Sequence, residues 1–239
     1  MNIYSMAFHF SPKVVLDGLV LSLDAANTRS YPGSGTSWLD LGKNQLTGTL
    51  TNGPTFESDN LGSIKFDGVD SYVQIPDNPS ISSLSSISIS AWVKFNTFSL
   101  PVGRQMIVEK HTSPTQGWWL AGQNNSLTWV VVTSTGPKFI NNTNTFLNTT
   151  SIYNVVGTYN GTTGSIKVYV NSIDDGGTLN GTGTTGLVNS PNALYIGSEV
   201  NWFPIYGSTN IYNLSIYDTE LSQSEVSQNF KALKSRFGL

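Results

Sequence analysis

The side chains best suited to acid–base or metal chemistry are scarce in this chain. Its 239 residues include two histidines, His9 and His111, and no cysteine. His111 follows Glu109 by two positions and precedes a serine-containing loop, so a Ser–His–acid arrangement is compatible with the composition, but the sequence contains no G-x-S-x-G nucleophile elbow. A zinc site built on two histidines without cysteine would be weak. We therefore expect both histidines to be ordinary polar residues and predict no metal ligands.

Paired carboxylates are equally hard to find. A glycosidase needs two carboxyl groups that face each other, about 5–5.5 Å apart for retention of configuration and further apart for inversion. The stretches 57–59 and 174–175 hold neighbouring acids, but both lie in polar loop sequence. Glu109 is the one acid in a clear strand pattern, and Lys110 after it must point to the opposite face. We predict no catalytic residues and no enzymatic activity.

One loop gathers aromatic side chains that could recognise a ligand. Trp202, Phe203 and Tyr206 fall within six residues, between turn signals and next to Asn201. Exposed aromatic rings beside amides can stack on sugars or fill a protein interface. We predict that these three residues form a ligand-binding surface, with burial in the chain's own core as the alternative.

A pair of consecutive tryptophans adds a further candidate. Trp118 and Trp119 lie in a strand pattern and must face opposite sides of it, so at least one meets a second layer or solvent. We assign Trp118 to the ligand-binding set. For Trp119 and Trp129 we expect core packing, because aromatic side chains dominate core burial.

The elements that position these residues read as strands. Residues 86–95 alternate apolar and polar side chains with a period of two, and about a dozen segments of this kind follow one another between turn signals. No helical period separates them, which predicts an all-β fold: an antiparallel two-sheet jelly-roll sandwich. The sequence YNGTTGS at 159–165 is typical of a hairpin loop. Residues 28–62 and 172–191 are rich in Gly, Ser, Thr and Asn, and we expect long surface loops there.

A single helix is expected near the C-terminus, over 222–237. Ser222 and Glu225 have the spacing of a capping box, and Gly238 is placed to end the helix in a left-handed conformation. Val226 begins an apolar stripe that continues at intervals of three to four residues. The stripe favours a helix packed on the sandwich over one that protrudes to dock a partner.

Composition excludes several classes of partner. Only 11% of the residues are charged, against about 25% in a typical protein, and the formal net charge is −3. A weakly acidic chain has no long-range attraction for nucleic acid. No apolar run approaches the roughly 20 residues that cross a bilayer, so we expect no membrane insertion. The start of the chain lacks the pattern of a cleaved secretory signal.

Several segments together resemble laminin-G-like domains of the concanavalin A-like lectin/glucanase superfamily. The segments that carry the resemblance are 18–41, 48–56, 64–75, 88–95, 155–171 and 214–239. The opening segment and the closing NFKALKSRFGL are similar, more narrowly, to laminin-G-like structural proteins of tailed bacteriophages of cyanobacteria. Strand patterns resume on both sides of the two long loops, so we expect one domain over 1–239, with an N-terminal arm at 1–17 and the C-terminal helix at 222–237.

The resemblance also raises the question of calcium. Asp40 matches a common ligand position of the family, whereas Tyr212 stands where the family's later motif has an acidic ligand. Calcium binds six to eight oxygens, usually with several carboxylates. We therefore expect no cofactor, with calcium as an alternative, and we expect Asp40 and Asp70 to stabilise turns by accepting backbone N–H bonds.

For function, the resemblance implies a non-enzymatic structural protein of the phage virion: a capsid decoration, head fibre or tail-associated module. Its expected location is the particle surface, and its expected partners are other virion proteins, in many copies, with surface glycans as a further candidate. The alternatives are a free carbohydrate-binding lectin-like domain and, less favoured, a glycoside-active enzyme of the same fold. The fold alone does not decide among them.

Overall fold

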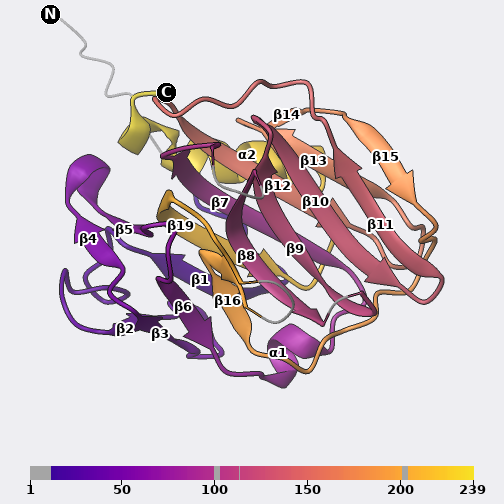
Figure 1. Cartoon of the computed structure of the whole chain (residues 1–239), viewed down its shortest axis with the longest axis horizontal. Helices are drawn as coiled ribbons and strands as arrows, with labels where there is room; N and C mark the ends of the chain where they lie inside the picture. The colour runs from indigo at the N-terminus through magenta and orange to yellow at the C-terminus, as the bar shows by residue number, and fades with distance from the viewer. Residues whose placement is uncertain (1–11, 100–102, 113, 201–203) are drawn as a thin grey trace, which may run out of the picture.

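The computed structural model describes residues 12–99, 103–112, 114–200 and 204–239. Two large antiparallel sheets face each other and enclose the main hydrophobic core, and Figure 1 shows β8 to β11 as neighbouring strands of one of them. The prediction of an all-β two-sheet sandwich with a short C-terminal helix is confirmed.

One sheet has eight strands within the described residues. Its pairing order is β14 (Ile173–Asp174), β13 (Ile166–Val170), β12 (Ile152–Tyr159), β7 (Ile87–Phe95), β19 (Thr209–Tyr217), β5 (Ser63–Lys65) and β4 (Thr55–Glu57), and β1 (Leu19–Asp24) also pairs with β19.

The other sheet has nine strands within the same ranges. Its pairing order is β15 (Thr178–Gly181), β11 (Gly136–Asn141), β10 (Ser126–Thr133), β9 (Gln116–Gln123), β8 (Arg104–Thr112), β16 (Leu194–Ile196), β6 (Tyr72–Ile75), β3 (Thr47–Thr51) and β2 (Ser37–Leu39).

Shorter elements complete the described part of the chain. They are the hairpin of β17 (Ser198–Glu199) with β18 (Ile205–Tyr206), the helices α1 (Pro79–Ser82) and α2 (Gln223–Leu233), and the 3₁₀ turns η1 (Asp59–Leu61) and η2 (Lys234–Phe237). None of these helices is long and apolar enough to span a membrane.

The core follows from the period of two along the central strands. In β7 the alternate residues Ile87, Ile89, Ala91, Val93 and Phe95 all belong to the main core cluster, as expected from the sequence. In β10 of the opposite sheet, Leu127, Trp129 and Val131 do the same. Each central strand therefore has one face that points into the sandwich and one that points away from it.

Trp129 ties the two sheets together. Its Nε1 donates a hydrogen bond of 3.0 Å to the carbonyl oxygen of Thr158 on β12, in the other sheet. The neighbouring Gly157 makes room for the indole, because a Cβ there would lie 2.7 Å from Trp129 Cδ2. The expectation that Trp129 is a core residue is confirmed.

The outer face of the eight-stranded sheet is covered by the C-terminal helix. Val226 of α2 packs with Val156, Tyr169 and Tyr217 of the sheet in a second apolar cluster. Ser222 and Glu225 form the predicted capping box, and Gly238 has the expected positive φ of 71°. The prediction of a helix packed on the sandwich is therefore confirmed, with its last turn tightened into η2.

Two predicted loops were wrong. Residues 28–62 contain β2, β3 and β4, and residues 172–191 contain β14 and β15. These strands are two to five residues long, and β2, β4, β14 and β15 lie at the ends of the strand order. Edge strands are held by backbone hydrogen bonds and bury few side chains, so Thr, Gly and Asn suffice and no alternating pattern marks them.

Candidate functional site

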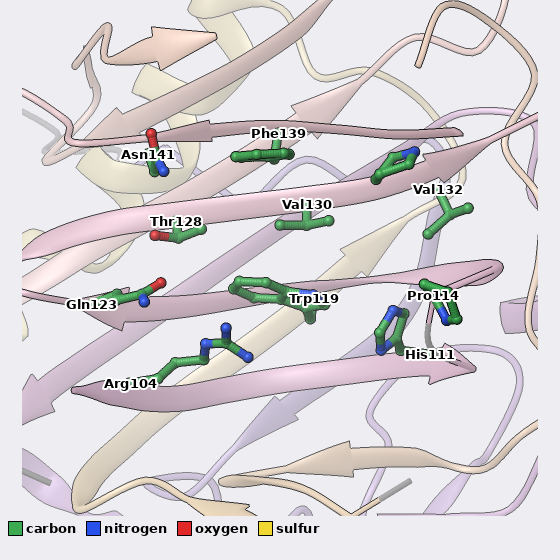
Figure 2. Close-up of a pocket in the computed structure, with 11 residues that line it drawn as sticks. Arg104, His111, Pro114, Trp119, Gln123, Thr128, Val130, Val132, Phe139 and Asn141 are labelled. Carbon is green, nitrogen blue, oxygen red and sulfur yellow. The ribbon is translucent and has the colours of Figure 1, made fainter. Parts of the chain in front are cut away.

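A pocket of about 270 Å³ lies on the outer face of the nine-stranded sheet, over β8 to β11. Its residues come from the strand positions that alternate with the core positions: Thr128, Val130 and Val132 from β10, and Pro137, Phe139 and Asn141 from β11. Figure 2 shows Thr128, Val130 and Val132 along one strand and Phe139 and Asn141 along its neighbour. The same period of two that builds the core thus builds the pocket on the opposite face.

Trp119 lies at the centre of the pocket and gives it an apolar floor (Figure 2). It is 8% exposed and belongs to a small apolar cluster with Val130, Met106 and Ile205, against which Phe139 packs. Ile205 belongs to β18, and both β17 and β18 contact β8. The β17–β18 hairpin therefore covers part of the outer face beside the pocket.

One end of the pocket is polar. The Arg104 guanidinium lies 4.4 Å from the centroid of the Trp119 ring, and Gln123 and Asn141 line the same end. Thr128 Oγ1 and Arg104 Nε are buried and make no hydrogen bond to any described residue. Buried polar atoms are normally paired, so these two are placed to bond water or a ligand.

A cluster of charged groups adjoins the pocket, and two of its members, Arg104 and His111, line it. Arg104 Nη1 and Glu199 Oε2 are 2.9 Å apart, and His111 Nδ1 is 3.9 Å from both Glu199 Oε1 and Glu109 Oε2. Glu109 Oε1 also accepts a hydrogen bond of 3.2 Å from the backbone N–H of Val200. His111, Glu109 and Glu199 are all at least 95% buried.

Burial sets the electrostatics of this cluster. It lowers the pKa of His111 to about 4, and the positive charge of Arg104 contributes in the same direction. Burial also raises the pKa of Glu199, against the opposing effect of its ion pair with Arg104. His111 is therefore a neutral imidazole at pH 7.

The cluster contains a carboxylate pair that the sequence did not reveal. One oxygen each of Glu109 and Glu199 lies within 4.8 Å of the other, close to the separation used by retaining glycosidases. The two residues are far apart in sequence, and the pairing of β16 with β8, which sets Tyr195 opposite Glu109, brings them together. Both are buried, however, and neither lines the pocket.

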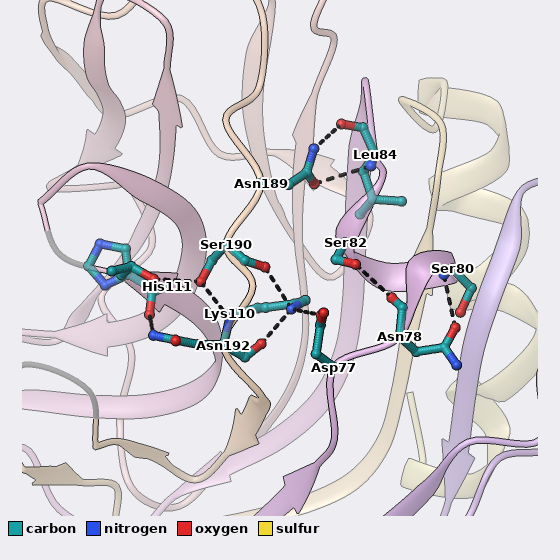
Figure 3. A network of polar contacts seen from close by, with 11 residues as sticks. Asp77, Asn78, Ser80, Ser82, Leu84, Lys110, His111, Asn189, Ser190 and Asn192 are labelled. Atoms are coloured by element: carbon teal, nitrogen blue, oxygen red, sulfur yellow. Dashed lines mark hydrogen bonds and ion pairs between the residues drawn. The ribbon is translucent and has the colours of Figure 1, made fainter.

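Lys110 points away from this cluster, as its place next to Glu109 predicted. Its Nζ donates to the carbonyl oxygen of Ser190 at 2.8 Å, to that of Asn192, and to the Asp77 carboxylate. Figure 3 shows this network on one side of the strand and the His111 imidazole on the other. On one face of β8, Glu109 and His111 belong to the charged cluster. On the other face, Lys110 holds the loop around residue 190.

The predicted binding residues are distributed differently from expectation. Trp118 is 1% exposed and belongs to the main core, with its ring 6.4 Å from that of Trp129, so its assignment to the ligand-binding surface was wrong. Its neighbour Trp119 is buried in a smaller apolar cluster, as expected of a packing residue, and it also lines the pocket. Strand alternation requires opposite faces for the pair, but the sequence does not say which of the two faces inward.

The aromatic loop is described only in part. Trp202 and Phe203 lie outside the described residues, and Tyr206 is half-buried on β18, opposite Ser198 of β17. Tyr206 does not line the pocket. A ligand-binding role for the three residues stays a prediction.

The residues considered for calcium have structural roles. Asp40 Oδ1 accepts backbone N–H bonds from Ser22 at 2.8 Å and from Gly42 at 2.7 Å, as expected of a turn-stabilising acid. We expected Asp70 to stabilise its turn in the same way. In that turn the accepting carboxylate is instead Asp67, which accepts from the backbone N–H of Val69 at 2.9 Å and of Asp70 at 3.3 Å. Tyr212 is buried. Whether calcium binds stays a prediction.

Comparison with known proteins identifies the domain type. A laminin G family model, described as the concanavalin A-like lectin/glucanases superfamily, matches residues 67–227. No curated protein matches the chain.

Several solved structures share the fold at low sequence identity. The binding domain of Paraclostridial Mosquitocidal Protein 1 has a TM-score of 0.67 and 17% identity, over 89% of this chain and 52% of that one. The botulinum neurotoxin serotype G binding domain has a TM-score of 0.63 and 17% identity, over 89% and 50%. The Trypanosoma rangeli sialidase in complex with sialic acid has a TM-score of 0.65 and 18% identity, over 95% and 36%. This chain thus spans about half of each toxin chain and about a third of the sialidase.

Proposed function

We propose that this chain, which belongs to the concanavalin A-like lectin/glucanases superfamily, is a non-catalytic carbohydrate-binding module whose ligand occupies the outer-face pocket. The observation that carries the proposal is the combination of an aromatic floor, Trp119, with two buried polar atoms that have no partner among the described residues, Thr128 Oγ1 and Arg104 Nε.

The chemistry of the pocket suits a sugar ring. A pyranose presents an apolar C–H face, which packs against an aromatic ring, and an edge of hydroxyl groups, which both donate and accept hydrogen bonds. The pocket offers Trp119 to the face and Thr128, Gln123, Asn141 and Arg104 to the edge. Its volume is near the lower end of small-molecule pockets, about 300–1,000 Å³, so a short saccharide is the fitting ligand.

The relatives support binding as the role of this type of domain. Two of them are named as toxin binding domains, and the third is a sialidase solved with sialic acid, of which this chain spans about a third. In this chain, Glu109 and Glu199 are buried and do not line the pocket, so a sugar in the pocket would not lie between them. For this reason we propose binding without hydrolysis.

The test is a pair of matched substitutions. Thr128→Val keeps the side-chain shape and removes the hydroxyl; since Oγ1 has no partner among the described residues, stability should change by less than about 0.5 kcal/mol. Affinity for a glycan found on an array should fall about 3- to 10-fold, the value of one hydrogen bond. Thr158→Val is the control, because Thr158 Oγ1 is also buried without a described partner but lies on the other sheet, and it should bind as the parent does.

Two outcomes would contradict the proposal. Equal affinity of Thr128→Val and Thr158→Val, measured by calorimetry with the same glycan, would place the ligand elsewhere, with the loop at 201–206 as the rival surface. New reducing ends released from the glycan by the parent but not by Glu109→Gln would make the chain a glycosidase.

We further propose that the module works as a component of a phage virion. The support is the resemblance of residues 18–41 and 229–239 to structural proteins of tailed phages. In this setting one surface attaches to other virion proteins and the pocket faces outward to glycans. A free lectin-like domain is the alternative.

A further inference from the structure

The charged cluster beside the pocket has the composition of a metal site. Glu109 and His111 stand two positions apart on β8 and share one face of the strand, and β17 brings Glu199 to the same place. We propose that Glu109, His111 and Glu199 bind one divalent transition-metal ion of the zinc type, and that this ion fastens the β17–β18 hairpin to β8. The sequence did not predict this, because Glu199 is remote from the other two in the chain.

The geometry is close to what such an ion requires. One donor atom from each residue lies within 4.8 Å of the other two, and His111 Nδ1 is 3.9 Å from an oxygen of each carboxylate. In a tetrahedral zinc site with bonds of 2.0–2.1 Å, donor atoms are about 3.4 Å apart. Side-chain movements of about an ångström would therefore close the three donors around an ion, with a fourth position for water.

The charges also favour a cation. Glu109 and Glu199 are 0% and 1% exposed, and Glu199 forms an ion pair with Arg104. Lys110 points to the other side of β8, toward Asp77. Buried carboxylates are costly unless they are paired or coordinate a metal, and a divalent ion at this position would be attracted to both carboxylates.

The surroundings resemble those of a supported metal site. Arg104 bonds Glu199 through Oε2, which leaves Oε1 directed toward His111. Carboxylates that bind metals are commonly held in this way by an outer partner. The imidazole in the set favours zinc or a similar transition metal over calcium and magnesium, which prefer oxygen ligands alone. The proposed metal site adjoins the proposed sugar pocket, because His111 and Arg104 line that pocket, whereas Glu109 and Glu199 do not.

The experiment uses the untagged full chain, stripped with chelator and titrated with ZnCl₂ by calorimetry, with bound zinc counted by elemental analysis after dialysis. We expect one zinc per chain and a rise in melting temperature with zinc, because the ion binds the folded state. His111→Ala and Glu199→Gln should each weaken binding by about tenfold or more, on the scale of lost metal-site contacts. His9→Ala is the matched control, since His9 is the only other imidazole, and it should bind zinc as the parent does.

Other results would overturn the proposal. These are no zinc retained after dialysis, zinc lost in His9→Ala but kept in His111→Ala, or a melting temperature that responds to calcium and not to zinc. Should His111→Ala fail to fold, as judged by its far-UV circular dichroism, the isosteric Glu199→Gln decides: unchanged zinc affinity in that variant contradicts the site. Failure of glycan binding in the Thr128→Val series would leave the zinc result unaffected.

Discussion

Tyr217 shows how a single buried residue makes the fold sensitive to pH. Its ring is 1% exposed, its hydroxyl accepts from Asn229 Nδ2 at 3.0 Å, and it lies 3.3 Å from the carbonyl oxygen of Val15. Burial raises the pKa of Tyr217 to about 12, from an ordinary value of 10.0. The hydroxyl thus joins the N-terminal segment to the helix only while it keeps its proton.

The raised pKa predicts a loss of stability in alkali. Below pH 10 both the folded and the unfolded chain keep the phenolic proton, so the contribution is fully present. Between pH 10 and 12 the unfolded chain ionises first, and the free energy of unfolding should fall by about 2–3 kcal/mol through this group alone. Tyr217→Phe should be less stable than the parent by about 1 kcal/mol at pH 8, because it loses the hydrogen bonds of the hydroxyl. Its free energy of unfolding should then decrease less steeply than that of the parent between pH 10 and 12. Urea titrations at each pH measure the free energy of unfolding of parent and variant. If the two free energies decreased in parallel with pH, the prediction would be contradicted.

At the level of single residues, the sequence predicted on which face of a strand some side chains lie, but not which distant residues they contact. It placed Glu109 and Lys110 on opposite sides of a strand, and the structure confirms this. It did not bring Glu199 to His111, because strand register between distant segments leaves no local pattern. It also assigned Trp118 to the binding surface, although Trp118 faces the main core, since the order of faces is fixed by pairing with neighbouring strands and not by the tryptophan pair itself.

At the level of elements, the C-terminal helix closes one face of the sandwich through its final turn. Phe237 stacks on Trp92 of β7 with ring centroids 4.2 Å apart and meets Tyr212 of β19 edge-on at 5.2 Å. Arg236 pairs with Asp24 of β1 at 2.8 Å and donates to the carbonyl oxygen of Gly62. The end of the chain therefore contacts three strands, β7, β19 and β1, and the loop at Gly62.

These contacts predict the effect of removing one ring. Phe237→Ala should lower the free energy of unfolding by about 2–3 kcal/mol, less than the 3–5 kcal/mol of a fully buried Phe because the ring is half-buried. Lys231→Ala, at an exposed position of α2, should change it by less than about 0.5 kcal/mol. Denaturant unfolding measures both variants. A loss for Phe237→Ala as small as that of the control would mean that the helix is free to dock a partner.

Some helices and strands could be predicted from the sequence and others could not. The helix was predicted because its signals are local: Ser222 and Glu225 cap it, and the apolar stripe follows. The long strand β7 was predicted because one of its faces is wholly apolar. The hairpin of β17 and β18 has two residues in each strand and contributes to a cluster on the outside of the sheet, so no alternation could reveal it.

The whole molecule presents two different outer faces. The eight-stranded sheet is covered by α2, whereas the nine-stranded sheet carries the pocket, bordered by the β17–β18 hairpin. A particle-bound module with this arrangement can attach by one side and leave the pocket open. A pocket of about 270 Å³ gives few contacts per sugar, so useful attachment requires many copies, which can raise the effective affinity about 10²- to 10⁴-fold.

If the proposed virion role holds, we expect the chain in purified phage particles at many copies per particle. Quantitative mass spectrometry of gradient-purified particles should find its peptides in a fixed ratio to the major capsid protein, because attachment through many weak pockets requires repeated display. Treatment with a protease should cleave it on intact particles, since a glycan-binding face must be accessible. The matched control is the culture fluid cleared of particles. A chain found there and missing from the particles would favour the free lectin-like domain and contradict the virion proposal, whereas a chain found in particles at one copy or fewer would contradict multivalent attachment.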